Sequence, residues 1–164
     1  NDFFRASETV YDPTTRQDVP NRNKGAGIVI FLNQVRALRA AGVDIITTSA
    51  AGQLNDPTFN GYYTWPRFGY SGRITDAKFR RLSPRLQAAM GNSREVRDLF
   101  DLPGGSDEWE MKGGWIECEF DLKNDSRNMK ALQTYIDYTK TPQYQEDRRR
   151  RDAARAARKA ARRG

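Results

Sequence analysis

The last seventeen residues of the chain, RRRRDAARAARKAARRG, offer nothing to a hydrophobic core. They contain nine arginine or lysine residues, one aspartate and no apolar side chain larger than alanine, which gives a net charge of +8. The whole chain of 164 residues has a net charge of +7, so residues 1–147 sum to −1. The core of this chain must therefore come from its other residues, and we expect a domain over residues 1–140 and a basic tail over residues 141–164.

Arginine and alanine both favour helix, and the arginines at 148, 151, 155, 158 and 162 recur at intervals of three or four. Without a large apolar residue, such a helix would not insert into a membrane. Two interpretations stay open: a segment that neutralises nucleic-acid phosphates with little sequence preference, or a solubilising or localisation tail. The first assigns nucleic-acid contacts to Arg148, Arg149, Arg150, Arg151, Arg155, Arg158, Lys159, Arg162 and Arg163.

The first fifty residues alternate between strand-like and helix-like patterns. Residues 3–11 are rich in β-branched and aromatic side chains and predict a strand, whereas residues 12–24 contain two prolines and predict a loop. Apolar residues then recur at helical spacing from Ala26 until Gly42 ends the pattern. Residues 43–49 predict a buried strand, so this part should form a unit like βαβ.

The remainder of the domain predicts mostly short helices. We expect a helix capped by Asp56 or Thr58 and stopped by Pro66 and Gly69. Three short amphipathic helices follow between residues 75 and 102, two of them opened by Ser83 and Ser93, and residues 103–108 should form a turn. Residues 114–122 alternate between apolar and charged side chains and predict a strand, and a helix capped at residue 125 or 126 comes next. The expected fold class is therefore α/β, with a mixed, twisted sheet flanked by helices.

Residue usage excludes several kinds of chemistry. The chain has no histidine and one cysteine, Cys118, which rules out Ser-His-Asp and Cys-His machinery and argues against a zinc site, so we expect no metal. A single cysteine suits a reducing compartment, so we expect a cytoplasmic protein, with a virion as the alternative.

The hexapeptide RNKGAG stands directly before the first predicted helix. Unpaired amides at a helix N-terminus, with glycines that let a ligand approach, would favour a phosphate, although a plain loop entering a helix would have the same residues. It matches neither a Walker A loop nor a dinucleotide fingerprint. The loop resembles the Arg/Gln-x-x-Gly-x-Gly/Ala motif of the GNAT acyltransferases, and Phe68-Gly69-Tyr70 resembles a turn that follows later in that family.

This resemblance covers the C-terminal half of a GNAT domain, with a helical insertion at about residues 75–111. It implies binding of acetyl-CoA and direct attack of an amine on the thioester. The pyrophosphate would be held by Arg22, Asn23, Lys24, Gly25, Ala26 and Gly27. Trp65 occupies the position of the family's usual tyrosine acid, so Tyr62 or Tyr63 would protonate the departing thiolate.

A second hypothesis follows from the same resemblance. The chain is also similar to a divergent GNAT-like group associated with phage and mobile elements, which would make it an inactive structural protein of a virion or a nucleic-acid complex. Because only half of a GNAT sheet is present, we expect a partner protein or an upstream segment to pair with the strand at residues 3–11.

Overall fold

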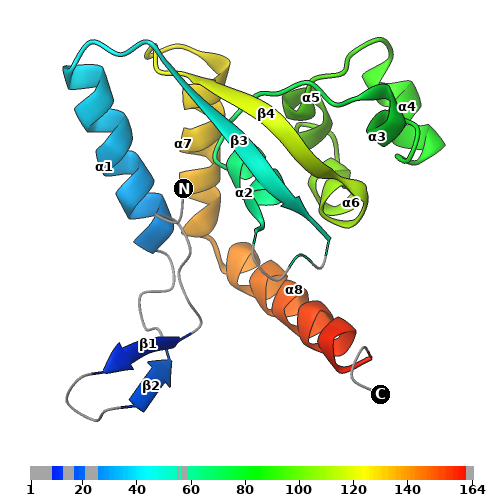
Figure 1. Cartoon of the computed structure of the whole chain (residues 1–164). Helices are drawn as coiled ribbons and strands as arrows, with labels where there is room; N and C mark the ends of the chain where they lie inside the picture. The colour runs from blue at the N-terminus through cyan, green and yellow to red at the C-terminus, as the bar shows by residue number, and fades with distance from the viewer. Residues whose placement is uncertain (1–8, 13–16, 21–25, 55, 57–58, 162–164) are drawn as a thin grey trace. The chain divides into compact units, whose positions relative to one another are not determined.

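The computed structural model describes residues 9–12, 17–20, 26–54, 56 and 59–161 (Figure 1). The chain divides into two compact units, residues 1–44 and residues 45–164. The described residues form both helices and strands, so the expectation of a mixed α/β protein is confirmed.

The first unit contains a short hairpin and one helix. Strands β1 (Thr9–Asp12) and β2 (Gln17–Pro20) pair antiparallel, with Val10 opposite Val19. The expectation of a loop throughout residues 12–24 is wrong at β2, because pairing with β1 satisfies backbone groups that the polar composition suggested would face water. Most of the strand expected at residues 3–11 lies outside the described residues.

Helix α1 (Ala26–Ala40) begins and ends where the sequence predicts. At its C-terminus Gly42 has a φ of +78°, which favours glycine. The amide of Gly42 donates to the carbonyl of Arg39 at 3.0 Å, and the amide of Val43 donates to that of Leu38 at 3.0 Å. These are the two hydrogen bonds of a Schellman motif, so the glycine stops the helix by a known local geometry.

The second unit is built on one antiparallel pair of strands, β3 (Ile45–Gln53) and β4 (Gly114–Asp121). Alternation along β4 is confirmed: Ile116, Cys118 and Phe120 are buried, and Trp115 on the other face is 51% exposed. Ser71 extends the pairing on the far side of β4, since its amide and carbonyl both bond to Glu119, at 2.9 and 2.8 Å.

The expected βαβ-like unit and mixed sheet are wrong for the strands that the structure describes. β2 pairs with β1, and β3 pairs with β4, so the strands on either side of α1 belong to different sheets and both pairs are antiparallel. The burial of β3 explains this. A strand in a parallel βαβ unit is covered on both faces, whereas Ile45 on β3 is 53% exposed.

Two helices cover the apolar face of β3 and β4 (Figure 1). These are α2 (Gly61–Arg67) and α7 (Arg127–Thr139), and Phe120 and Leu132 are buried between the layers. Neither cap expected for α2 is found, because its N-cap is Asn60; Asp56 instead accepts a hydrogen bond from the amide of Phe59, and Thr58 lies outside the described residues. The cap of α7 is Ser126, as expected, and its side chain accepts from the amide of Met129 at 3.1 Å.

The three expected short helices are present between α2 and β4. They are α3 (Asp76–Phe79), α4 (Pro84–Met90) and α5 (Val96–Phe100). Ser83 is the N-cap residue of α4, although its hydroxyl donates to Glu108 instead of capping the helix, whereas the N-cap of α5 is Glu95 and not Ser93.

Helix α6 (Gly105–Lys112) occupies most of the segment that we expected to be a turn. Gly104, with a φ of +77°, precedes it, and Trp109 anchors it as a fully buried residue of the core. The residues PGGSDE predicted a turn, but burial of the Trp109 side chain stabilises a helix at this position. The chain ends in α8 (Pro142–Ala160), so the expected boundary at residue 140 coincides with the loop before this helix and stays a prediction.

Candidate functional site

The residues of the expected pyrophosphate loop fall mainly outside the described residues. Arg22, Asn23, Lys24 and Gly25 are among the undescribed ones, and Ala26 and Gly27 are the first two residues of α1. A β-carbon placed on Gly27 would meet no atom within 4 Å, and the first turn of α1 carries no acidic residue. Among the described residues, therefore, no atom fills the space beside Gly27 and no acidic side chain belongs to this first turn.

The two candidate tyrosines occupy different environments on α2. The hydroxyl of Tyr62 donates to the backbone carbonyl of Glu110 at 2.7 Å, and the indole of Trp109 donates to the backbone carbonyl of Tyr62 at 2.8 Å. These two bonds fasten α2 to α6. The hydroxyl of Tyr62 therefore serves the packing of the core.

Tyr63 is also buried, with 3% of its surface exposed, but it lines a cavity. Within the described part of the chain, its hydroxyl has no hydrogen-bond partner. Burial raises the pKa of the phenol, while the charges of Arg67 and Arg151 act in the opposite direction. The phenol is thus neutral near pH 7 and able to donate a hydrogen bond.

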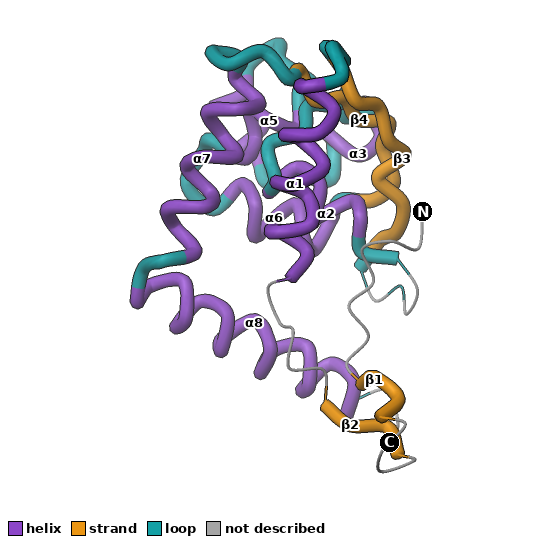
Figure 2. The backbone as a smooth tube through the Cα atoms, turned by 90° about the vertical axis from the view of Figure 1, so that its left-hand side faces the viewer, coloured by secondary structure: helices purple, strands orange, loops and turns teal. Residues whose placement is uncertain are grey.

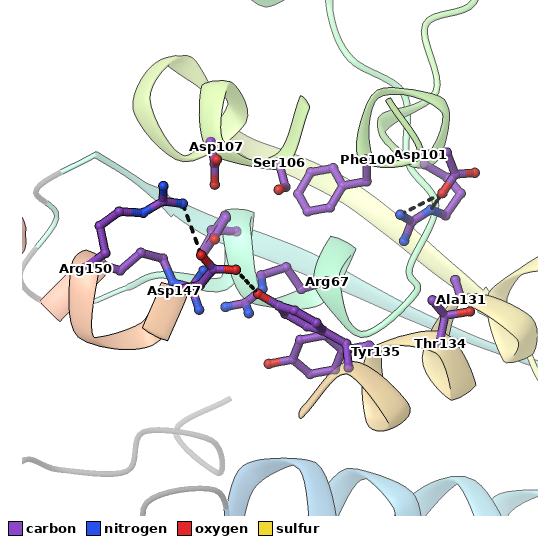
Figure 3. Close-up of a pocket in the computed structure, with 14 residues that line it drawn as sticks. Arg67, Phe100, Asp101, Ser106, Asp107, Ala131, Thr134, Tyr135, Asp147 and Arg150 are labelled. Atoms are coloured by element: carbon purple, nitrogen blue, oxygen red, sulfur yellow. Dashed lines mark hydrogen bonds and ion pairs between the residues drawn. The ribbon is translucent and has the colours of Figure 1, made fainter. Parts of the chain in front are cut away.

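The cavity has a volume of about 510 Å³ and is surrounded by five helices of the second unit (Figure 3). Helices α5 and α6 form one side, and α2, α7 and α8 form the rest. Its aromatic and basic walls come mainly from Tyr63 and Arg67 on α2, Tyr135 and Tyr138 on α7, and Arg150 and Arg151 on α8.

Arg67 is held in the cavity by aromatic rings. Its guanidinium carbon lies 5.0 Å from the centre of the Tyr63 ring and 4.9 Å from that of Tyr135. Figure 3 shows Arg67 beside Tyr135. None of the carboxylates in the described ranges forms an ion pair with it. Burial raises the pKa of Tyr135 to about 12; the charge of Arg67 opposes this increase, and the hydrogen bond with Tyr144 adds to it.

The acidic residues of the cavity are largely engaged by other groups. Asp147 accepts from the hydroxyl of Tyr138 and pairs with Arg150 at 3.3 Å. Asp101 pairs with Arg97 at 3.0 Å. Asp107, from α6, also lines the cavity and is exposed. Positive charge in the cavity is therefore less fully paired than negative charge.

Seven of the nine basic residues expected to meet nucleic acid belong to one helix, α8. Thr141 caps α8, accepting from the amide of Tyr144 at 3.2 Å, and the Tyr144 ring packs edge-on against Tyr138 at 5.3 Å. From this anchor α8 runs away from the end of α7 (Figure 2). Beyond Arg151, every residue whose side chain is described is exposed.

The predicted contacts are arranged along the length of α8. Arg149 is exposed, while Arg148 lies 4.0 Å from Asp152 and Arg150 pairs with Asp147. Arg155, Arg158 and Lys159 belong to the same helix, and Arg162 and Arg163 lie outside the described residues.

The cavity is the feature that reasoning from the sequence missed. The one signal present was the spacing of its aromatic and basic residues, since Tyr63 and Arg67 stand four apart and Tyr135 and Tyr138 stand three apart. Such pairs share a helix face, but the sequence does not show that the two faces meet.

Three further observations bear on function. In the described ranges, no helix is long and apolar enough to cross a membrane. Nor does this part of the chain gather three acidic or cysteine side chains that could hold a metal ion. Comparison with protein-family models, with curated proteins and with solved structures finds no match.

Proposed function

We propose that the protein binds nucleic acid through α8, with the α/β unit at residues 45–164 holding the base of this helix. The observation that carries the proposal is the separation of charge. Residues 148–164 have a net charge of +8, residues 1–147 have −1, and the described part of α8 beyond Arg151 is exposed.

The dimensions of α8 suit a duplex. Nineteen residues of helix extend for about 28 Å, roughly the length of eight base pairs, and the major groove admits an α-helix. Beyond Arg151 the sequence of α8 consists of alanine, arginine, lysine and one aspartate, and it lacks the asparagine and glutamine that read adenine. Arginine and lysine are also the side chains that contact phosphates. We therefore expect contacts with phosphates and little preference among sequences.

A charge-matched pair of variants tests this proposal. One replaces Arg149, Arg155, Arg158 and Lys159 of α8 with glutamine; the control replaces the exposed residues Arg36, Arg73, Arg80 and Arg81 with glutamine. Both lose four positive charges. Fluorescence anisotropy with a labelled 20-base-pair duplex should show at least a hundredfold loss of affinity for the first variant and a few-fold loss for the control. Equal losses would show that net charge, and not α8, drives binding.

A second candidate function is acetyl-CoA-dependent acyl transfer. The order of elements that the GNAT resemblance implies supports it: α1 begins at Ala26, β3 and α2 follow, and Gly69 has a φ of +104° within the Phe-Gly-Tyr turn. No described atom lies within 4 Å of a β-carbon placed on Gly27, which would leave room for a pyrophosphate at this helix N-terminus.

Calorimetry with CoA tests this second candidate. Gly27→Glu would place a carboxylate at the start of α1 and should abolish binding, whereas Ala37→Glu adds the same charge to an exposed position of the same helix and should not. If the unmodified chain gave no heat with CoA, the candidate would be rejected.

A further inference from the structure

The hydroxyl of Tyr63 is a buried polar group of the second unit that has no hydrogen-bond partner among the described residues. It belongs to a side chain that is 97% buried, yet no described residue accepts from it or donates to it. Nearly all buried polar side chains have a hydrogen-bond partner. Since Tyr63 lines a cavity of about 510 Å³, the missing partner is best sought in a molecule that occupies this cavity.

Arg67 adds a positive charge to the same cavity. Its contacts with the Tyr63 and Tyr135 rings hold the guanidinium in place, and no described residue accepts a hydrogen bond from its N–H groups. Arg97, another arginine of the lining, is different, because it donates to the carbonyl of Pro66 at 2.8 Å and pairs with Asp101. Arg97 serves the fold, whereas Arg67 keeps its hydrogen-bonding capacity.

Helix α8 brings further positive charge to this place. Arg151 lines the cavity, where its charge acts to lower the pKa of Tyr63 and its side chain bonds to the hydroxyl of Tyr138. Among the nearby carboxylates, Glu110 is buried and Asp107 is exposed. Tyr63, Arg67 and Arg151 all line this cavity, so it offers hydrogen-bond donors and positive charge that suit an anionic group.

The rest of the lining narrows the class of anion. The aromatic residues Phe100 and Tyr138 provide apolar surface, and the carboxylate of Asp107 could accept from an amine or a hydroxyl of a ligand. A phosphate joined to a sugar and a base would use all three kinds of group.

We propose that this cavity is a nucleotide-binding site in which Tyr63, Arg67 and Arg151 hold the phosphate. The nucleotide is either free or part of a strand bound along α8. Binding of a free nucleotide would be independent of the function proposed above. Binding of a nucleotide that belongs to a strand rests on that proposed function.

Neighbouring tyrosines provide the test. Calorimetry on the full chain should show that AMP binds at least tenfold more tightly than adenosine, because adenosine lacks the phosphate. Tyr63→Phe should weaken AMP about tenfold without lowering the melting temperature, since the hydroxyl that it removes has no partner in the described protein. Tyr62→Phe should lower the melting temperature and leave the affinity for AMP unchanged. The hydroxyl of Tyr62 donates to the backbone carbonyl of Glu110, and Tyr62 does not line the cavity.

Competition separates the two sources of the nucleotide. If a single-stranded oligonucleotide displaces AMP from the intact chain but not from the variant lacking four charges on α8, the nucleotide belongs to a strand. If AMP binds and the oligonucleotide does not displace it, the ligand is free. Equal affinity for AMP and adenosine, or equal effects of the two tyrosine substitutions on AMP, would overturn the inference, and duplex binding by α8 would be unaffected by that result.

Discussion

Replacing Gly69 by alanine should severely destabilise the unit at residues 45–164. The φ of this glycine is +104°, and a β-carbon on it would lie 2.5 Å from the backbone carbonyl oxygen of Asn128, the second residue of α7. A left-handed conformation costs a residue with a β-carbon roughly 1–2 kcal/mol, and forcing an atom into a packed core costs about 1–3 kcal/mol more. We therefore expect a loss of about 3 kcal/mol in the free energy of unfolding, which corresponds to a fall of about 10 °C in the melting temperature.

Gly104 provides the matched control. Its φ is +77°, but the nearest atom to an added β-carbon is the end of the flexible Arg85 side chain, at 3.3 Å. Gly104→Ala should therefore cost only the backbone term, about 1 kcal/mol. Tryptophan fluorescence is the appropriate measurement, because all three tryptophans lie in the second unit. Equal losses for the two variants would refute the close packing of α7 against this turn.

Three other outcomes follow from the contacts of the second unit. Ser126→Ala removes the side-chain cap of α7 and should lower the free energy of unfolding by about 1 kcal/mol in a urea titration. Ser126→Asp keeps an oxygen that can cap the helix and should retain most of this stabilisation. Burial and nearby carboxylates raise the pKa of the Cys118 thiol to about 12, so iodoacetamide at pH 8 should alkylate it far more slowly in the native protein than in urea; equal rates would contradict its burial. Because Cys118 and Tyr135 ionise at lower pH in the unfolded chain, stability should be constant up to about pH 8 and fall as the pH rises towards 12; a melting temperature that does not change across this range would contradict these shifts.

Local signals explain most of what the sequence predicted correctly. The alternation of Ile116, Cys118 and Phe120 follows from the two-residue period of a strand with one buried face. The end of α1 at Gly42 and the start of α7 at Ser126 follow from hydrogen bonds within a few residues of the chain.

Errors arose where distant parts of the chain determine the structure. β3 pairs with β4, about seventy residues later, and no local pattern shows which strands will meet. Helix α6 depends on burial of Trp109 beneath α2, which outweighs the glycines before it. The cavity unites residues of five helices, so its site could be inferred only after those helices were placed.

The salt dependence of duplex binding tests the account of α8 most directly. Two of the nine basic residues in the segment from Arg148 onwards lie near aspartates, which leaves about seven to neutralise phosphates, so log affinity should fall against log salt with a slope of about −6 for the intact chain. A chain ending at Asp152 lacks five of these residues and should give a slope shallower by about 4, with an unchanged melting temperature, because the described side chains beyond that point are exposed. An identical slope for both chains would contradict the assignment of nucleic-acid binding to α8.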